Sequence, residues 1–301
     1  MDAHIEIVHH QKNLFGDVRV RYVILWLLLG AVLDILLIFY FKFFGYDKTL
    51  AVTGSLIAIQ GMLVLWAVTE MKRAGISIKR LFWGNGFDRS SWKHFLMVIP
   101  GFIFSIGSLI LFVTSMAWFF HLNTDSLIGT KSNDLVASPD TLAIPWLYYA
   151  LVFVATIIIA PIAEELAFRG MLINRWGLKW GIGHAIVLSS LLFGVLHGIT
   201  FIGTIVFALI IALIYLRTRS LVPGIIFHAI NNLIPFFATI QTSISGGGSA
   251  DMSELSLRDL FVSGALLVGI SLPIIIVYCY KNWPAKNAPL PYMAVEGELA
   301  Q

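Results

Sequence analysis

The chain has 301 residues, of which 58% are hydrophobic and 12% are charged, and its formal net charge at pH 7 is +3. Soluble globular proteins carry about 25% charged residues, so this composition excludes an ordinary water-soluble domain and a disordered chain. The net charge is small and the basic residues are dispersed between apolar runs, which also argues against a nucleic-acid partner.

Eight apolar stretches approach the roughly 20 residues that a helix needs to cross about 30 Å of hydrocarbon. They predict transmembrane helices at residues 20–41, 51–69, 95–120, 144–171, 183–198, 201–216, 221–240 and 260–280. The fifth and sixth stretches are short and only a brief corner at residues 198–200 separates them. One bent helix and a re-entrant pair are therefore alternatives for this region.

The polar residues before the first span include His4, His9 and His10 but no short apolar core followed by a cleavage site. They predict a solvated tail rather than a secretory signal or a metal site. With the N-terminus in the cytoplasm, 16 of the 20 basic residues fall in cytoplasmic segments. This bias predicts an N-in, C-in topology with an even number of spans.

The connecting segments are predicted from composition. The basic stretch at 71–94 either lies along anionic headgroups or forms a solvated loop. Residues 121–143 and the glycines at 246–248 indicate flexible connectors on the opposite side. The tail beyond Trp283, with three prolines, is predicted to be unstructured. Cys279 lies in an apolar run and supports neither a cysteine-based zinc site nor a thiol nucleophile.

A charged residue inside a span costs about 2.5–3.5 kcal/mol on insertion scales, so such residues are candidates for function. Asp34 stands alone in the first span and is interpreted as a protonated or hydrogen-bonded interior carboxyl. Three further polar sets lie in the C-terminal half.

The first set contains Glu164, Glu165 and Arg169. Adjacent residues on a helix point about 100° apart, so the two carboxylates have different tasks. Glu165 precedes Arg169 by four residues, the favourable order for an ion pair. Glu164 then has no local cation, which suits a general acid or base. The alternative is that both glutamates mark a cytoplasmic helix end.

The second and third sets each carry a histidine. Phe193 and His197 lie one helical turn apart, beside glycines that allow close helix packing. His228 and Asn232 share one helix face, so that an imidazole and an amide can converge on one oxygen atom. The alternatives are a packing histidine and hydrogen bonding between helices. His184 is interpreted as a helix-start residue.

Together the sets offer a carboxylate, two imidazoles and an amide, which are the groups needed to activate water and to stabilise an oxyanion. No serine or threonine stands in a comparable pairing with a histidine and an acid, and the zinc motif H-E-x-x-H is absent.

The order E-E-x-x-x-R at Glu164, F-x-x-x-H at Phe193 and H-x-x-x-N at His228 resembles the CPBP family of intramembrane proteases. These proteins, also called the Abi family, are bacterial relatives of the eukaryotic CAAX prenyl endopeptidase. The resemblance covers residues 144–240. It divides the chain into an N-terminal part at 1–143 with three spans, a protease core at 144–240, and a last span with a cytoplasmic tail at 241–301.

The resemblance implies an all-α membrane bundle around a polar cavity in which a peptide bond is hydrolysed. Glu164 and His197 would activate the water, and His228 and Asn232 would stabilise the oxyanion. Glu165, Arg169 and Phe193 would support them. The runner-up chemistry is zinc, held by Glu164, His197 and His228 as in a metalloprotease.

The expected partners are the lipid bilayer, in a bacterial plasma membrane, and a peptide or membrane-protein substrate. The resemblance also leaves open a non-proteolytic role, as a bacteriocin self-immunity factor or as a regulator that binds a membrane partner protein. A transporter is less well supported, because paired inverted halves are not visible.

Overall fold

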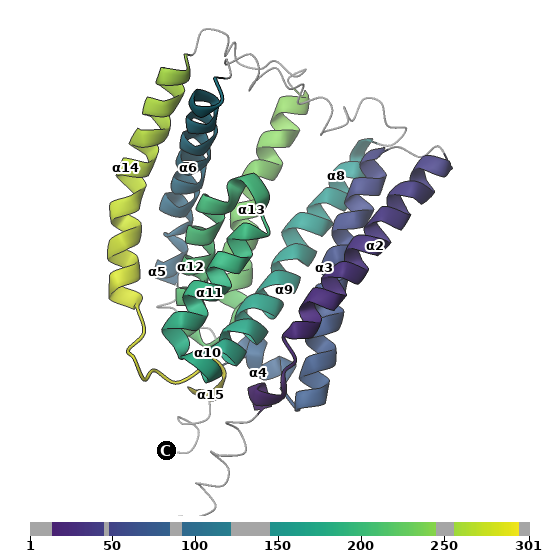
Figure 1. The fold of residues 1–301 in the computed structure, drawn as a ribbon, viewed down its shortest axis with the longest axis vertical. Helices are drawn as coiled ribbons and strands as arrows, with labels where there is room; N and C mark the ends of the chain where they lie inside the picture. The colour runs from purple at the N-terminus through teal and green to yellow at the C-terminus, as the bar shows by residue number, and fades with distance from the viewer. Residues whose placement is uncertain (1–13, 45–47, 85–91, 122–144, 245–255, 295–301) are drawn as a thin grey trace, which may run out of the picture.

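The computed structural model describes residues 14–44, 48–84, 92–121, 145–244 and 256–294, and within these ranges the chain forms helices and no strand. The histidines of the N-terminal tail and the predicted connectors at 122–143 and 246–248 lie outside the described residues. The long helices run along one bundle (Figure 1). The first half contains η1 (Leu14–Asp17), α2 (Arg21–Phe43), α3 (Lys48–Ala74), α4 (Ile78–Trp83), α5 (Trp92–Phe95) and α6 (Val98–Phe119).

The second half begins with one composite helix and ends with a short helix near the C-terminus. Its elements are α8 (Pro145–Phe153), η5 (Val154–Ile159), α9 (Ala160–Glu165), η6 (Leu166–Ile173), α10 (Asn174–Trp180), α11 (Ile182–Val195), η7 (Gly198–Thr200), α12 (Phe201–Thr218), α13 (Leu221–Ile244), α14 (Leu257–Asn282) and α15 (Pro291–Ala294). The start of α2 and the end of α14 lie at the same end of the bundle (Figure 1).

The all-α, multi-pass membrane bundle is confirmed. Within the described ranges, six helices are long and apolar enough to cross a membrane: 21–43, 93–119, 146–180, 198–218, 221–241 and 257–282. The other two predicted spans correspond to α3, with 27 residues, and to α11, with 14 residues. At 1.5 Å per residue α11 is only about 21 Å long, which is short for a complete crossing.

The hydrophobic core surrounds α12, which packs against α6, α11, α13 and α14. Every residue from 210 to 215 is at most 1% exposed. A helix that is apolar on all sides is stable only where other helices or lipid surround it. Here other helices do so, and α12 forms the centre of the molecule.

The short fifth and sixth segments form a hairpin, since α11 packs along α12 and η7 makes the corner. The single bent helix is therefore wrong. Gly194 allows the close approach, because a Cβ there would lie 2.3 Å from Cγ1 of Ile205. Gly198 turns the corner with a left-handed φ of +61°. The corner lies below the upper ends of α6, α13 and α14 (Figure 1).

The composite helix contains two π-helical segments, η5 and η6. In η5 the Ala160 N–H donates to the carbonyl of Ala155, five residues earlier. The same pattern would pair the Thr156 carbonyl with residue 161, which is a proline and has no N–H. Pro161 thus leaves the Thr156 carbonyl open to a side chain from another helix.

The C-terminal tail is not unstructured throughout, contrary to the prediction. Tyr292 of α15 is 3% exposed, and its ring packs edge-on against Phe15 at 5.2 Å. Its hydroxyl accepts a hydrogen bond from the Ser77 N–H at 3.0 Å, and its carbonyl accepts one from Arg80 Nη2 at 2.6 Å. Tyrosine has an apolar ring and a polar hydroxyl, so Tyr292 can pack against Phe15 and still form hydrogen bonds. Helix α15 therefore covers the end of the bundle beside α4.

Candidate active site

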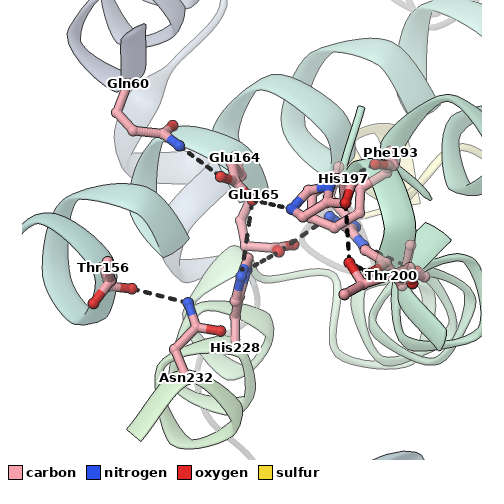
Figure 2. Close-up of polar contacts among 12 residues, drawn as sticks. Gln60, Thr156, Glu164, Glu165, Phe193, His197, Thr200, His228 and Asn232 are labelled. Carbon is pink, nitrogen blue, oxygen red and sulfur yellow. Dashed lines mark hydrogen bonds and ion pairs between the residues drawn. The ribbon is translucent and has the colours of Figure 1, made fainter. Parts of the chain in front are cut away.

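The Glu164 carboxylate lies at the centre of the candidate site. The residue is 8% exposed, and its Oε1 accepts a hydrogen bond from Gln60 Nε2 at 2.6 Å. Its other oxygen, Oε2, is buried and has no hydrogen-bond partner among the described residues. That oxygen lies 3.9 Å from His197 Nε2 and 3.8 Å from His228 Nε2 (Figure 2). The structure therefore brings three of the four predicted catalytic residues together from α9, the α11–α12 corner and α13.

The second nitrogen of each imidazole has a fixed partner. His197 Nδ1 lies 2.6 Å from the Phe193 carbonyl oxygen, and His228 Nδ1 lies 2.9 Å from Glu165 Oε1. Both partners are acceptors, so each Nδ1 carries the hydrogen. In a neutral imidazole the Nε2 atom then has a lone pair. Three acceptor atoms consequently face one another, and a water molecule, which has two hydrogens, can donate to two of them.

Glu165 and Arg169 form the predicted ion pair, with Nη1 3.1 Å from Oε1. The side chains are 0% and 1% exposed, so no solvent screens the pair. Arg169 Nη2 also donates to the Ala208 carbonyl of α12 at 3.0 Å. Because Glu165 Oε1 accepts from both Arg169 and His228, the pair orients the His228 ring.

Phe193 orients the other imidazole. The phenyl ring is stacked on the His197 ring, with the centroids 4.4 Å apart and the planes 29° apart. The Arg169 guanidinium lies 4.8 Å from the centroid of the same phenyl ring. A cation close to an aromatic face is attracted to it. Arg169 therefore stabilises both Glu165 and Phe193, the residues that orient the two imidazoles. The predicted supporting residues thus lie next to the predicted catalytic ones.

Asn232 lies one turn beyond His228 on α13, but its side-chain hydrogen bond points elsewhere. Its Nδ2 donates to the Thr156 carbonyl at 2.9 Å, the group that Pro161 leaves open (Figure 2). Among the described residues, the hydrogen bonds of Asn232 do not reach Glu164 or either imidazole. The amide is therefore held beside the site by the composite helix.

Gln60 is the site residue that sequence reasoning missed. It lies on α3, 104 residues before Glu164. The available signal was an amide inside the otherwise apolar run Leu-Ile-Ala-Ile-Gln-Gly-Met-Leu-Val-Leu. Like the charged residues of the three polar sets, an amide inside a span is unfavourable in hydrocarbon, which makes it a candidate for function. His184 matches its prediction, since it lies in the first turn of α11 and bonds the Trp180 carbonyl at 2.9 Å.

The donor types at the site suit zinc, but their spacing does not. Zinc bonds of about 2.0–2.1 Å in a tetrahedral site put neighbouring ligand atoms roughly 3.3–3.5 Å apart. Here the carboxylate oxygen is 3.9 and 3.8 Å from the two nitrogens. No three His, Cys, Asp or Glu side chains in the described ranges are placed to hold a metal ion.

Comparisons with known proteins give one match. No curated protein and no solved structure matches the chain. Residues 145–234 match the family described as Type II CAAX prenyl endopeptidase Rce1-like. The matched segment runs from α8 into α13 and contains all the predicted site residues but not Gln60. Residues 145–234 therefore form a domain of the Rce1-like type II CAAX prenyl endopeptidase family within a multi-pass, all-helical membrane protein.

Proposed function

We propose that this protein is an intramembrane endopeptidase that hydrolyses peptide bonds of membrane-associated proteins or peptides with a water held by Glu164, His197 and His228. One observation carries the proposal: the unpartnered Oε2 of Glu164 lies within 3.9 Å of Nε2 of both imidazoles. The family match supports the same reaction class.

Glu164 acts as the general base. The water donates one hydrogen to Glu164 Oε2 and the other to His197 Nε2, whose lone pair is free when Nδ1 donates to Phe193. As Glu164 takes the proton, the water oxygen forms a bond to the peptide carbonyl carbon. Glu164 then gives this proton to the leaving nitrogen as the C–N bond breaks, and the products are a carboxylic acid and an amine.

His228 and Asn232 stabilise the oxyanion of the tetrahedral intermediate. His228 can donate from Nε2 only when Nδ1 and Nε2 are both protonated. In that state the two carboxylates of the site are balanced by Arg169 and His228. The Asn232 amide has two hydrogens, of which the Thr156 carbonyl takes one. The second is available to the oxyanion.

Substrate reaches the site beside His197. The His197 side chain is 34% exposed, whereas Glu164 and His228 are 11% and 4% exposed. His197 lies at the corner of the α11–α12 hairpin, so this edge of the site is its most open part. The deeper carboxylate is shielded from bulk water, which strengthens the hydrogen bonds that form during reaction.

The test uses full-length protein in proteoliposomes and two quenched peptide libraries, one carrying a prenylated C-terminal cysteine motif and one spanning the bilayer without a lipid. Glu164→Ala, His197→Ala and His228→Ala should each abolish the cleavage that the wild type performs. His184→Ala is the matched control, because it removes an imidazole of α11 outside the site. Undiminished cleavage by all three correctly inserted site variants would overturn the proposal.

The chemistry we favour depends on the glutamate and on no metal. Exhaustive chelation that leaves a stable enzyme with full activity would support it. Loss of activity that Zn²⁺ alone restores would favour the metalloprotease alternative, with Glu164, His197 and His228 as ligands.

We further propose a bacterial plasma membrane as the location, with the basic end of the bundle in the cytoplasm. Lys72 and Arg73 close α3, Arg217 closes α12, and Lys281 closes α14, at the end where α2 begins. Basic residues near span ends are retained in the cytoplasm. Cysteines introduced into each connecting segment should react with an impermeant thiol reagent from only one side.

A further inference from the structure

The site receives one polar group from outside the matched family segment. Gln60 lies on α3, and α3 packs along α8, η5, α9 and η6, which together form the helix that carries Glu164. The hydrogen bond from Gln60 Nε2 to Glu164 Oε1 is 2.6 Å long and joins residues that are 104 positions apart (Figure 2). The N-terminal helices, which carry no motif of their own, therefore reach the centre of the candidate site.

This bond determines which oxygen of Glu164 is available for chemistry. An ionised carboxylate only accepts hydrogen bonds, so the amide must present its NH₂ group to it. With Oε1 engaged by Gln60, the oxygen that faces both imidazoles is Oε2, which has no hydrogen-bond partner among the described residues.

Stability alone does not explain an amide at this position. Gln60 Oε1 is buried and has no hydrogen-bond partner in the described part of the chain. Burial of an unpaired polar atom is unfavourable, and an apolar side chain of similar volume would pack on α3 without this penalty. The bond to Glu164 is the interaction that distinguishes glutamine from methionine here.

We propose that Gln60 is a positioning residue for hydrolysis: it holds Glu164 in the rotamer that directs Oε2 to the two imidazoles. The inference rests on the proposed function. It assigns part of the catalytic apparatus to α3, outside residues 145–234.

The test replaces Gln60 by methionine, which keeps the length and apolar packing of the side chain but has no N–H. In proteoliposomes, with the library peptide that the wild type cleaves best, Gln60→Met should lower kcat about tenfold and leave KM within about twofold. Its thermal unfolding temperature in detergent should stay close to that of the wild type, because the removal of the unpaired buried amide oxygen offsets the donor lost to Glu164 Oε1. Thr69→Val, on an exposed position of the same helix, is the matched control and should change neither value.

Two results would overturn this role for Gln60. A kcat of Gln60→Met within twofold of the wild type would show that Glu164 does not need the bond. A fall in kcat together with a lower unfolding temperature would assign Gln60 to helix packing. These results leave the proposed function intact if Glu164→Ala is inactive, whereas full activity of Glu164→Ala removes the proposed function itself.

Discussion

Helix α2 and the π-helical segment η6 are both rich in apolar residues, yet they have opposite surroundings. Of the 23 residues of α2, only Val23 and Gly30 are buried, and side chains such as Phe39 are 66% exposed. All eight residues of η6 are buried. Lipid can surround the apolar surface of α2, whereas other helices surround η6. Hydropathy identifies both as membrane segments but does not distinguish the lipid-facing helix from the enclosed one.

The polar residues of these two regions differ in the same way. Asp34 of α2 has a buried Oδ1 without a hydrogen-bond partner among the described residues. In η6, Arg169 pairs with Glu165 at the end of α9, and Glu165 also contacts His228. Hydrocarbon supplies no donors, so charged groups accumulate where several helices can satisfy one another. The comparison predicts that equal substitutions in the two regions have unequal effects.

The largest difference is expected between the two intramembrane acids. Glu164→Gln removes the proposed base and should lower hydrolysis about a thousandfold. Asp34→Asn, the same chemical change on α2, should leave hydrolysis within about twofold of the wild type, because Asp34 is not one of the three groups that meet at the candidate site. Cleavage rates in proteoliposomes measure both. Equal losses in the two variants would contradict the division between the regions.

The next effect concerns the two arginine–glutamate pairs. Arg169→Met leaves the Glu165 charge buried and should reduce the free energy of unfolding by about 3–5 kcal/mol. The Arg73 side chain is 33% exposed and its partner Glu70 is 6% exposed, but Glu70 keeps the Arg19 N–H as a donor, so Arg73→Met should cost less, about 1 kcal/mol. Unfolding in detergent compares the two. A larger loss for Arg73→Met would show that burial does not govern these pairs.

Replacement of two glycines by alanine should change the stability of the protein in opposite directions. At Gly194 a Cβ would lie 2.3 Å from Ile205 Cγ1 and 2.8 Å from the Phe201 carbonyl oxygen. Gly194→Ala should therefore destabilise the hairpin by about 1–3 kcal/mol. At Gly61 of α3 a Cβ would meet nothing within 4 Å, so Gly61→Ala should stabilise the helix by about 0.5–1 kcal/mol. Thermal unfolding measures both effects. If Gly194→Ala leaves the unfolding temperature unchanged, the α11–α12 hairpin is less tightly packed than the structure indicates.

The smallest effect is expected at the C-terminal end. Tyr292→Phe removes the hydroxyl that accepts from the Ser77 N–H and should cost about 1 kcal/mol. Tyr280 is 85% exposed on α14, so Tyr280→Phe should change stability by less than about 0.5 kcal/mol. The difference in unfolding temperature between these variants measures the contribution of α15. If both behave alike, α15 does not stabilise the bundle through this hydroxyl.

Local spacing in the sequence determined a large part of this protein. Apolar runs of about 20 residues specified the membrane helices, and the i, i+4 spacing specified the Glu165–Arg169 pair. The same spacing placed Phe193 directly beside His197. These features depend on hydropathy and on the geometry of a single helix, which the order of residues fixes.

Contacts between helices were decided only by the tertiary structure. Spacing along α13 predicted that His228 and Asn232 can converge on one oxygen atom, but it did not predict that Asn232 donates to the Thr156 carbonyl of another helix. Gln60 is too far from Glu164 in the sequence for any local pattern to join them. The burial of Tyr292 likewise depends on Phe15 at the opposite end of the chain. Helical periodicity determines the direction in which a side chain points from its helix axis. Which residue it contacts depends on how separate helices pack, and local sequence patterns do not specify that packing.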